Sequence, residues 1–228
     1  MKNDQRPFPA ELKGQLIVSC QAVPGDPLDD AEILRRIAIS TLRGGAGGLR
    51  ANGAEAIRAF REETRLPILG ILKKYDHGEL CITPDFDSAQ AIAEAGADVI
   101  ALDSTADRPA YAEPCPRLIE RIHHELGVPV LADIATPEEA LAAEKAGADA
   151  VATTMYGFTR QTAGARSVNW ELLDRLVHTV RVPVIVEGHI TQPEEVRRAL
   201  DAGAFAVVVG SAITRPESIT ARFVKAIR

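Results

Sequence analysis

Short apolar runs alternate with amphipathic segments along the whole chain. The apolar runs cover residues 16–20, 46–50, 68–73, 98–102, 128–132, 149–153, 183–187 and 205–210. Apolar positions at helical spacing lie between them, as in residues 31–43, 115–126, 137–147, 169–180 and 193–203. Continuous apolar strands that alternate with helices indicate a parallel sheet covered on both faces. Eight such strands predict one (β/α)8 TIM barrel, an α/β fold that spans residues 1–228 as a single domain.

Two short submotifs repeat within this pattern. A proline opens three of the strands, at Pro67, Pro129 and Pro183, where no ladder hydrogen bond is required. An Ala-Gly-Ala triplet ends the helix before three others, at residues 95–97, 146–148 and 202–204, as expected for a glycine that caps a helix C-terminus. An open, doubly wound sheet is the weaker alternative, because no Gly-x-Gly-x-x-Gly sequence follows the first strand.

The composition agrees with an aliphatic barrel core. Only 4% of the 228 residues are aromatic and 46% are hydrophobic, so Val, Ile, Leu and Ala must fill the layers inside the barrel. A chain with few aromatic residues also has few surfaces on which nucleic-acid bases can stack. The net charge is −6 at pH 7, with no lysine- or arginine-rich block. We therefore expect no nucleic acid as a partner.

The sequence features that bear on cellular location favour the cytoplasm. The N-terminal residues contain no apolar stretch like the centre of a signal peptide. No apolar run approaches the ~20 residues that span a bilayer, so we expect no membrane association. The cysteines, Cys20, Cys81 and Cys115, have neither zinc-site spacing nor an evident disulfide pairing. A reducing compartment fits this usage.

Polar or ionisable residues stand where the predicted strands end. In parallel barrels the functional groups lie at this edge, because the carboxyl ends of all strands meet there. The candidates are Gln21, Arg50, Lys73, Asp103, Asp133, Thr153 and Glu187. A ring of such residues around one mouth predicts a functional site. The histidines show no metal-ligand spacing, and we predict no metal site.

Lys73 is the sharpest candidate for a catalytic base. It follows an apolar strand, so its ammonium group is expected in a partly dry pocket beside Arg50. Burial and a neighbouring cation both lower the pKa of a lysine from ~10.4 toward the range useful for a base. A structural role is equally open, in which Lys73 or Lys74 pairs with Asp103 or Glu187 and only holds the rim together.

Glu187 is the second catalytic candidate, as a general acid or base or as an acceptor for a substrate hydroxyl. Its alternative role is to partner a cation at the rim. Asp103 and Asp133 are expected to bind hydroxyl groups. Thr136, just before Pro137, is a better N-cap for the following helix than Asp133 is, which leaves Asp133 for the pocket.

Two successive strands end in glycine, at Gly188 and Gly210, and polar residues and a helix follow each of them. Glycine lets backbone N–H groups approach an anion, and the helix N-terminus adds favourable partial charge. Ser211 comes next, and Arg215 lies close behind, where a guanidinium can bind a phosphate bidentately. Gly188, Gly210, Ser211 and Arg215 therefore predict a phosphate site.

Nine segments carry a family resemblance: LIVSCQ (16–21), GLR (48–50), ILGILK (68–73), ITP (82–84), IALDST (100–105), ADIATPEEA (132–140), TTMYGFT (153–159), VEG (186–188) and VVGSAITRP (208–216). They resemble the N-acetylmannosamine-6-phosphate 2-epimerase family of sialic-acid catabolism. The resemblance implies a barrel like the ribulose-phosphate-binding barrels. It also implies a homodimeric isomerase that interconverts N-acetylmannosamine 6-phosphate and N-acetylglucosamine 6-phosphate without a metal or organic cofactor.

The same resemblance implies roles for the candidates. Lys73 removes and returns the C2 proton, and Glu187 assists, in ring opening or in handling the open-chain sugar. The positions that resemble substrate and phosphate contacts are Gln21, Arg50, Asp103, Asp133, Gly188, Gly210, Ser211 and Arg215. The chemistry agrees, because C2 of the open-chain sugar lies α to a carbonyl, so a positioned base forms an enolate whose oxyanion Arg50 or Gln21 can stabilise.

The chain departs from the family pattern in three places. Phe158 stands where the family usually has tyrosine, Asp85 after Thr83-Pro84 is unusual, and the loop 74–81 differs and includes His77. His77 and His189 are both expected on loops beside the mouth. At the C-terminus, the apolar residues Ile219, Phe223 and Ile227 are available for a dimer contact, although closing the chain's own barrel is their plainer use.

Two other functions stay open. Lys73 could form a Schiff base in a lyase or aldolase built on the same phosphate barrel. Alternatively, the chain could be a barrel that binds a sugar phosphate without catalysis, although the presence of both Lys73 and Glu187 disfavours this.

Overall fold

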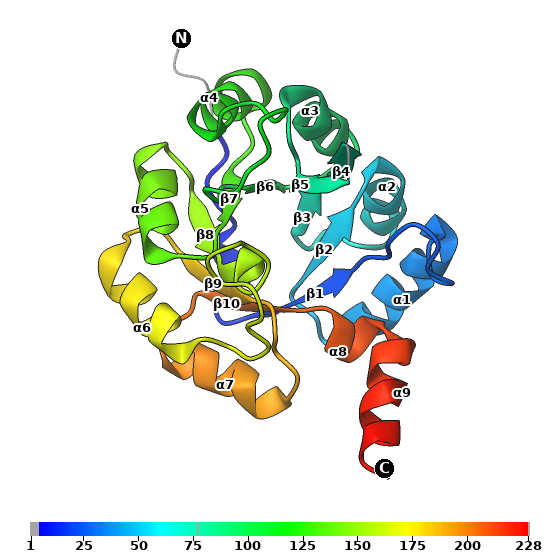
Figure 1. The fold of residues 1–228 in the computed structure, drawn as a ribbon. Helices are drawn as coiled ribbons and strands as arrows, with labels where there is room; N and C mark the ends of the chain where they lie inside the picture. Colours follow the sequence, from blue (N-terminus) through cyan, green and yellow to red (C-terminus); the bar gives the residue numbers. More distant parts are fainter. Residues whose placement is uncertain (1–4, 77, 228) are drawn as a thin grey trace.

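The computed structural model describes residues 5–76 and 78–227, which form a closed barrel of parallel strands surrounded by helices (Figure 1). Around the barrel the strands follow the order β1-β10-β9-β8-β7-β6-β3-β2. They are β1 (Leu16–Cys20), β2 (Gly48–Asn52), β3 (Ile68–Ile71), β6 (Val99–Asp103), β7 (Val130–Asp133), β8 (Ala150–Ala152), β9 (Val184–Glu187) and β10 (Ala206–Val209). The predicted (β/α)8 barrel is confirmed.

The helices alternate with these strands. They are α1 (Ala31–Arg43), α2 (Ala54–Glu63), α3 (Phe86–Glu94), α4 (Cys115–Arg121), α5 (Pro137–Lys145), α6 (Trp170–Thr179), α7 (Pro193–Asp201), α8 (Ser211–Thr214) and α9 (Pro216–Lys225). Thr136 caps α5 in a capping box with Glu139, as its position before Pro137 predicts. No helix of the described residues combines the length and the apolar character that crossing a membrane requires.

Strand alternation sends every second side chain into the barrel. Inward positions near the N-terminal ends are apolar, such as Ile17, Leu69 and Ile185, and they form an inner core. Outward neighbours such as Leu49 and Val186 pack under the helices in a second core. The same alternation turns the polar residues at the strand ends toward the barrel axis, where their side chains lie close together.

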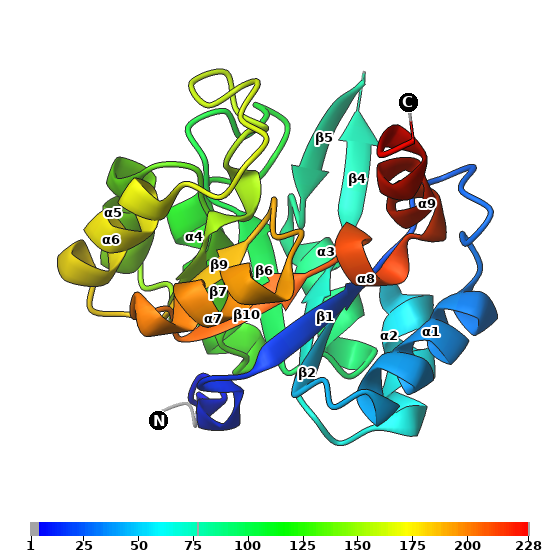
Figure 2. The same ribbon diagram turned by 90° about the horizontal axis from the view of Figure 1, so that it is seen from below.

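The third strand ends earlier than expected. The apolar run 68–73 predicts a strand that reaches Lys73, but β3 stops at Ile71. Lys73 instead begins β4 (Lys73–Asp76), which pairs antiparallel with β5 (Glu79–Ile82). Figure 2 shows this hairpin rising beside the barrel. Hydrophobic pattern alone does not detect where a strand leaves one sheet and enters another. The predicted loop residue His77 lies outside the described residues.

The last helix does not close the barrel, and that expectation is wrong. None of the residues of α9 is buried, and Phe223 is 73% exposed. The helix extends past α8 at the outer edge of the molecule (Figure 1). A groove of about 880 Å³ consequently lies open between α1 and α8, lined by apolar residues that include Val18, Ile37 and Ile213.

Candidate active site

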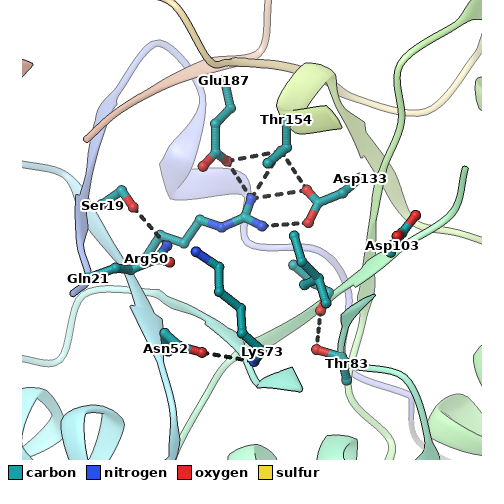
Figure 3. A network of polar contacts seen from close by, with 12 residues as sticks. Ser19, Gln21, Arg50, Asn52, Lys73, Thr83, Asp103, Asp133, Thr154 and Glu187 are labelled. Carbon is teal, nitrogen blue, oxygen red and sulfur yellow. Dashed lines mark hydrogen bonds and ion pairs between the residues drawn. The ribbon is translucent and has the colours of Figure 1, made fainter. Parts of the chain in front are cut away.

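A buried arginine lies at the centre of the residues that the strand ends bring together (Figure 3). The Arg50 side chain has no exposed surface, and its guanidinium ion-pairs with both Asp133 and Glu187. Its Nη1 donates to Asp133 Oδ1 at 3.1 Å and to Thr154 Oγ1 at 3.3 Å, and its Nη2 donates to Asp133 Oδ2. The two nitrogens therefore hold Asp133 bidentately, which fixes the plane of the guanidinium.

Thr154 completes this network. Its hydroxyl lies 2.6 Å from Asp133 Oδ1 and 3.2 Å from Glu187 Oε2. Asp133 thus has partners on both oxygens and is wholly buried. By contrast, the Arg50 Nε–H has no acceptor among the described residues, although it is buried. Because a buried donor without a partner is costly, this N–H is a candidate for a contact with a bound molecule.

Burial raises the pKa of Glu187, and the Arg50 guanidinium opposes that rise. The carboxyl group therefore binds a proton more readily than an exposed glutamate does. Glu187 also has the cation partner of its alternative role, and that cation is Arg50 rather than a lysine. The ion pair and a proton-handling role are compatible, because only Oε2 contacts Arg50.

Lys73 lies in the same pocket and its side chain extends toward Arg50 (Figure 3). Burial lowers the pKa of Lys73, and the positive charge of Arg50 lowers it further. Both causes are those that the sequence predicts. Its neighbour Lys74 is turned away and pairs with Asp85 at 2.9 Å, so the two lysines do not share a role. A half-buried amine with a lowered pKa is suited to accept a proton.

A cavity of about 510 Å³ opens over these groups at the carboxyl ends of the strands. The predicted site residues that line it are Gln21, Arg50, Lys73, Glu187, Gly188, Gly210, Ser211 and Arg215. The side chains predicted for proton transfer and the glycines predicted for phosphate thus share one cavity, which has the size of a small-molecule site.

The glycine-rich part of the cavity has the backbone features of an anion site. Gly188 has a φ of +98°, a conformation that residues with a Cβ rarely adopt. Gly210 precedes α8, so the amide groups of Ser211 and Ala212 have no acceptor within the helix. Arg215 supplies a cation and also lies 3.6 Å from Asp26. An anion here would meet N–H groups and a guanidinium together.

Three predicted residues lie outside the cavity lining. Asp103 is 2% exposed, and its Oδ1 accepts from the N–H and the hydroxyl of Thr105. Burial raises the pKa of Asp103. Asp133 faces Arg50, and the Thr153 hydroxyl bonds to the backbone of Glu187, at 2.9 Å from its oxygen and 3.0 Å from its nitrogen. Asp133 and Thr153 therefore hold residues that line the cavity, whereas the Asp103 carboxylate bonds to Thr105.

The list of candidate site residues omits several that the structure places at the site. Ser19 and Thr154 line the cavity, and the Ser19 hydroxyl accepts from Gln21 at 2.8 Å. Both stand beside predicted strand ends, and alternation along β1 places Ser19 with Gln21. Alternation does not apply to Thr154, because β8 ends at Ala152 and a 3-10 turn follows, so only its place after the predicted strand end marks it. Arg222 of α9 also lines the cavity.

Aromatic side chains border the mouth. Phe158 lines the cavity, remains 70% exposed and stacks on the His189 ring, with the ring centroids 5.9 Å apart. His189 is held by a 2.9 Å hydrogen bond to the Tyr156 carbonyl. Within the described chain, no group of three or more His, Cys, Asp or Glu side chains is arranged to hold a metal ion.

Comparison with known proteins gives consistent matches. A family model described as "Putative N-acetylmannosamine-6-phosphate epimerase" matches residues 34–228. A Clostridium perfringens protein named "Putative N-acetylmannosamine-6-phosphate 2-epimerase" is 46% identical over 213 residues, which is 93% of this chain and 96% of the relative. A protein of the same name from Synechococcus elongatus is 45% identical over 206 residues, 89% of each chain.

Solved structures agree with these sequence matches. The N-acetylmannosamine-6-phosphate 2-epimerase from Clostridium perfringens superposes with a TM-score of 0.90 at 44% identity, over 94% of each chain. A thiamine phosphate pyrophosphorylase from Pyrococcus furiosus gives a TM-score of 0.62 at 21% identity over 95% of this chain and 98% of that one, which shows the barrel fold alone. From its sequence, its barrel and these matches, the chain belongs to the N-acetylmannosamine-6-phosphate 2-epimerase family.

Proposed function

We propose that this protein is a sugar-phosphate 2-epimerase that interconverts N-acetylmannosamine 6-phosphate and N-acetylglucosamine 6-phosphate. The observation that carries the proposal is one cavity that contains a lysine of lowered pKa, an arginine–carboxylate network and a glycine-rich anion site. The family match supports the substrate. These chemical groups are those that proton exchange next to a carbonyl requires, and no step of it calls for a metal or organic cofactor.

Lys73 is the proposed base. Its neutral amine removes the C2 proton of the open-chain sugar, and the resulting ammonium returns a proton to C2 to give the other epimer. Because burial and Arg50 lower its pKa, a larger fraction of the amine is neutral at pH 7 than in an exposed lysine.

Arg50 is proposed to stabilise the oxyanion that develops as the C2 proton leaves. Its buried Nε–H has no acceptor among the described residues, and the Asp133 pairing holds the guanidinium rigid. A donor that is already oriented stabilises developing charge without reorganisation during the reaction. Glu187, with its raised pKa, is assigned to ring opening, where it passes a proton between ring oxygen and hydroxyl.

The phosphate is assigned to Gly188, Gly210, Ser211 and Arg215, which line one part of the cavity. Binding the phosphate there holds the far end of the sugar and orients C2 toward Lys73. For the sugar itself the candidates stay Gln21, Arg50, Asp103, Asp133 and Thr153. Gln21 and Arg50 line the cavity, so they are the ones proposed to touch the sugar first.

Proton NMR in D₂O tests the proposal directly. N-acetylmannosamine 6-phosphate incubated with the enzyme is expected to lose its C2–H signal while signals of N-acetylglucosamine 6-phosphate appear. If neither exchange nor epimerisation occurs, the proposed function is wrong. Borohydride trapping with substrate separates the aldolase alternative, because a Schiff base would leave a covalent adduct on Lys73 and an epimerase would leave none.

We further propose that two copies form a homodimer that covers α9. The support is the unburied apolar surface at this helix, with Phe223 exposed on it and Ile227 exposed just beyond its end, and the open apolar groove beside α1. Each copy carries both surfaces, so a second copy supplies matching cover for both. Light scattering during size-exclusion chromatography should give twice the 24.5 kDa chain mass, and Phe223→Glu should yield monomers. A monomeric unmodified protein would overturn this assignment.

A cytoplasmic role in sialic-acid catabolism completes the proposal. The free cysteines Cys20, Cys81 and Cys115 suit a reducing compartment, and the family to which the chain belongs supports the pathway. Fractionation of cells that produce the protein would test the location, with recovery outside the cytoplasmic fraction as the contrary result.

A further inference from the structure

Thr83 combines a rare backbone conformation with complete burial. It has a φ of +49°, and His189 is the other non-glycine residue with positive φ among the described residues. A β-branched side chain is costly in this region, so the surrounding structure must hold it there. Thr83 has no exposed surface. It directly follows β5 (Glu79–Ile82), the second strand of the hairpin that Lys73 begins.

The hydrogen bonds of Thr83 explain what holds it. Its N–H donates to the Leu72 carbonyl at 2.8 Å, and its hydroxyl accepts from the Leu72 N–H at 3.2 Å. Thr83 thus binds both backbone groups of the residue immediately before Lys73. The same hydroxyl donates to the Ala101 carbonyl in β6 at 2.7 Å, and Figure 3 shows Thr83 beside Lys73.

These bonds lie where two barrel strands separate. β3 and β6 pair directly at Leu69 and Val99 and again at Gly70 and Ile100. Beyond that point the Thr83 hydroxyl lies between the backbone that continues from β3 and the backbone of β6, and it is hydrogen-bonded to both. The chain after β3 is therefore diverted from the barrel sheet into the hairpin, and the diversion occurs at Lys73.

A second residue holds Lys73 from the other side. The Lys73 N–H donates to Asn52 Oδ1 at the end of β2, at 2.9 Å (Figure 3). Thr83 and Asn52 thus bind adjacent peptide groups, and neither side chain has an ionisable group. Nothing in the proposed proton transfer uses them, and Thr83 does not line the cavity.

We propose that Thr83, together with Asn52, is a positioning residue that sets the direction in which Lys73 enters the cavity. This inference rests on the proposed function, in which Lys73 exchanges the C2 proton. The strained Thr83 conformation is retained because its two hydrogen bonds to Leu72 place the backbone next to the lysine. A misplacement of about 1 Å can cost ~10²-fold in rate, so such a residue affects turnover more than binding.

The test compares Thr83→Val, which keeps the shape but removes the hydroxyl, with Thr83→Ser, which keeps the hydroxyl. We expect Thr83→Val to lower kcat by on the order of 10- to 100-fold with KM little changed, and Thr83→Ser to restore most of it. The pH profile should also move: a displaced Lys73 loses part of its burial, so the rise of kcat/KM shifts to higher pH. Unchanged kcat and pH profile in Thr83→Val would refute the positioning role.

Asn52→Ala tests the same role if Thr83→Val fails to fold. We again expect a lower kcat with little change in KM. Thr179→Val is the matched control, since the Thr179 hydroxyl bonds to the Arg175 carbonyl within α6 and the residue lines neither the cavity nor the groove beside α1. It should leave kcat and the pH profile unchanged. If the unmodified enzyme shows no C2–H exchange, the proposed function fails; if it exchanges normally and both positioning variants match it, only this inference fails.

Discussion

The two sides of the cavity are built in different ways. The side proposed for catalysis (the catalytic side) consists of ionisable side chains: Arg50, Asp133 and Glu187 hold one another in a buried network, and Lys73 extends toward Arg50 (Figure 3). The side proposed for phosphate (the phosphate side) consists of Gly188, Gly210, Ser211 and Arg215, and so relies on glycine backbone and the start of a helix, with one guanidinium. Geometry on the first side comes from contacts between distant strands, and on the second from local backbone conformation.

This difference predicts different responses to substitution. Removing a group from the catalytic side should affect turnover or stability strongly, because each group adjusts the charge and the position of the others. Removing one from the phosphate side should affect substrate binding, because several backbone groups remain. The following experiments, from the largest expected effect to the smallest, test whether the two sides separate in this way.

Lys73→Ala should show the largest loss. Without its base, C2–H exchange should fall by on the order of 10³-fold or more, whereas the protein should remain folded and should still bind inorganic phosphate. Proton NMR in D₂O measures the exchange and calorimetry measures the binding. Full activity in this variant would remove Lys73 as the base.

The Arg50→Met variant should have the lowest free energy of unfolding among these variants. It leaves Asp133 and Glu187 without their buried partner, and breaking such a pair typically costs about 3–5 kcal/mol. Urea denaturation should show this loss in the free energy of unfolding. Adding Asp133→Asn should recover part of it, because the unpaired buried charge is removed. No recovery would mean that Arg50 stabilises the fold by packing rather than by charge.

Arg215→Ala should weaken the binding of the phosphorylated sugar. The loss of a charged hydrogen-bond donor, about 1.5–3 kcal/mol, corresponds to roughly a 10- to 100-fold rise in KM for the phosphorylated sugar, with little change in kcat. Arg197→Ala is the control, since Arg197 lies on α7 with its side chain 78% exposed. A fall in kcat at constant KM would place Arg215 on the catalytic side of the comparison.

The pH dependence should give the smallest effect and the finest test. The base must be neutral, so kcat/KM should rise with pH as Lys73 loses its proton, with a midpoint below the ordinary value of 10.5. In Arg50→Gln the midpoint should move up, because a cation that lowers the pKa of Lys73 is gone and its carboxylate partners remain. A midpoint that stays in place would show that burial alone lowers this pKa.

The barrel was predictable because its pattern is repeated and local. Strand positions and the Thr136 cap follow from apolar runs and from residues within one turn. The support of the Lys73 backbone was not predictable, because it depends on Thr83 and Asn52, which contact Leu72 and Lys73 only once the barrel has folded. The place of α9 was likewise missed, since apolar residues do not reveal which surface they cover.

By itself, the sequence determined the eight strands, the ring of polar residues at their carboxyl ends and the glycines of the proposed anion site. These depend on periods of two and on residues adjacent in the chain. Only the tertiary structure decided that Arg50 pairs with Asp133 and Glu187, which lie 83 and 137 residues away. It also decided that Thr154 faces the cavity while Thr153 holds the backbone. Contacts of that kind arise when a barrel closes, because closure brings every strand end to the same mouth.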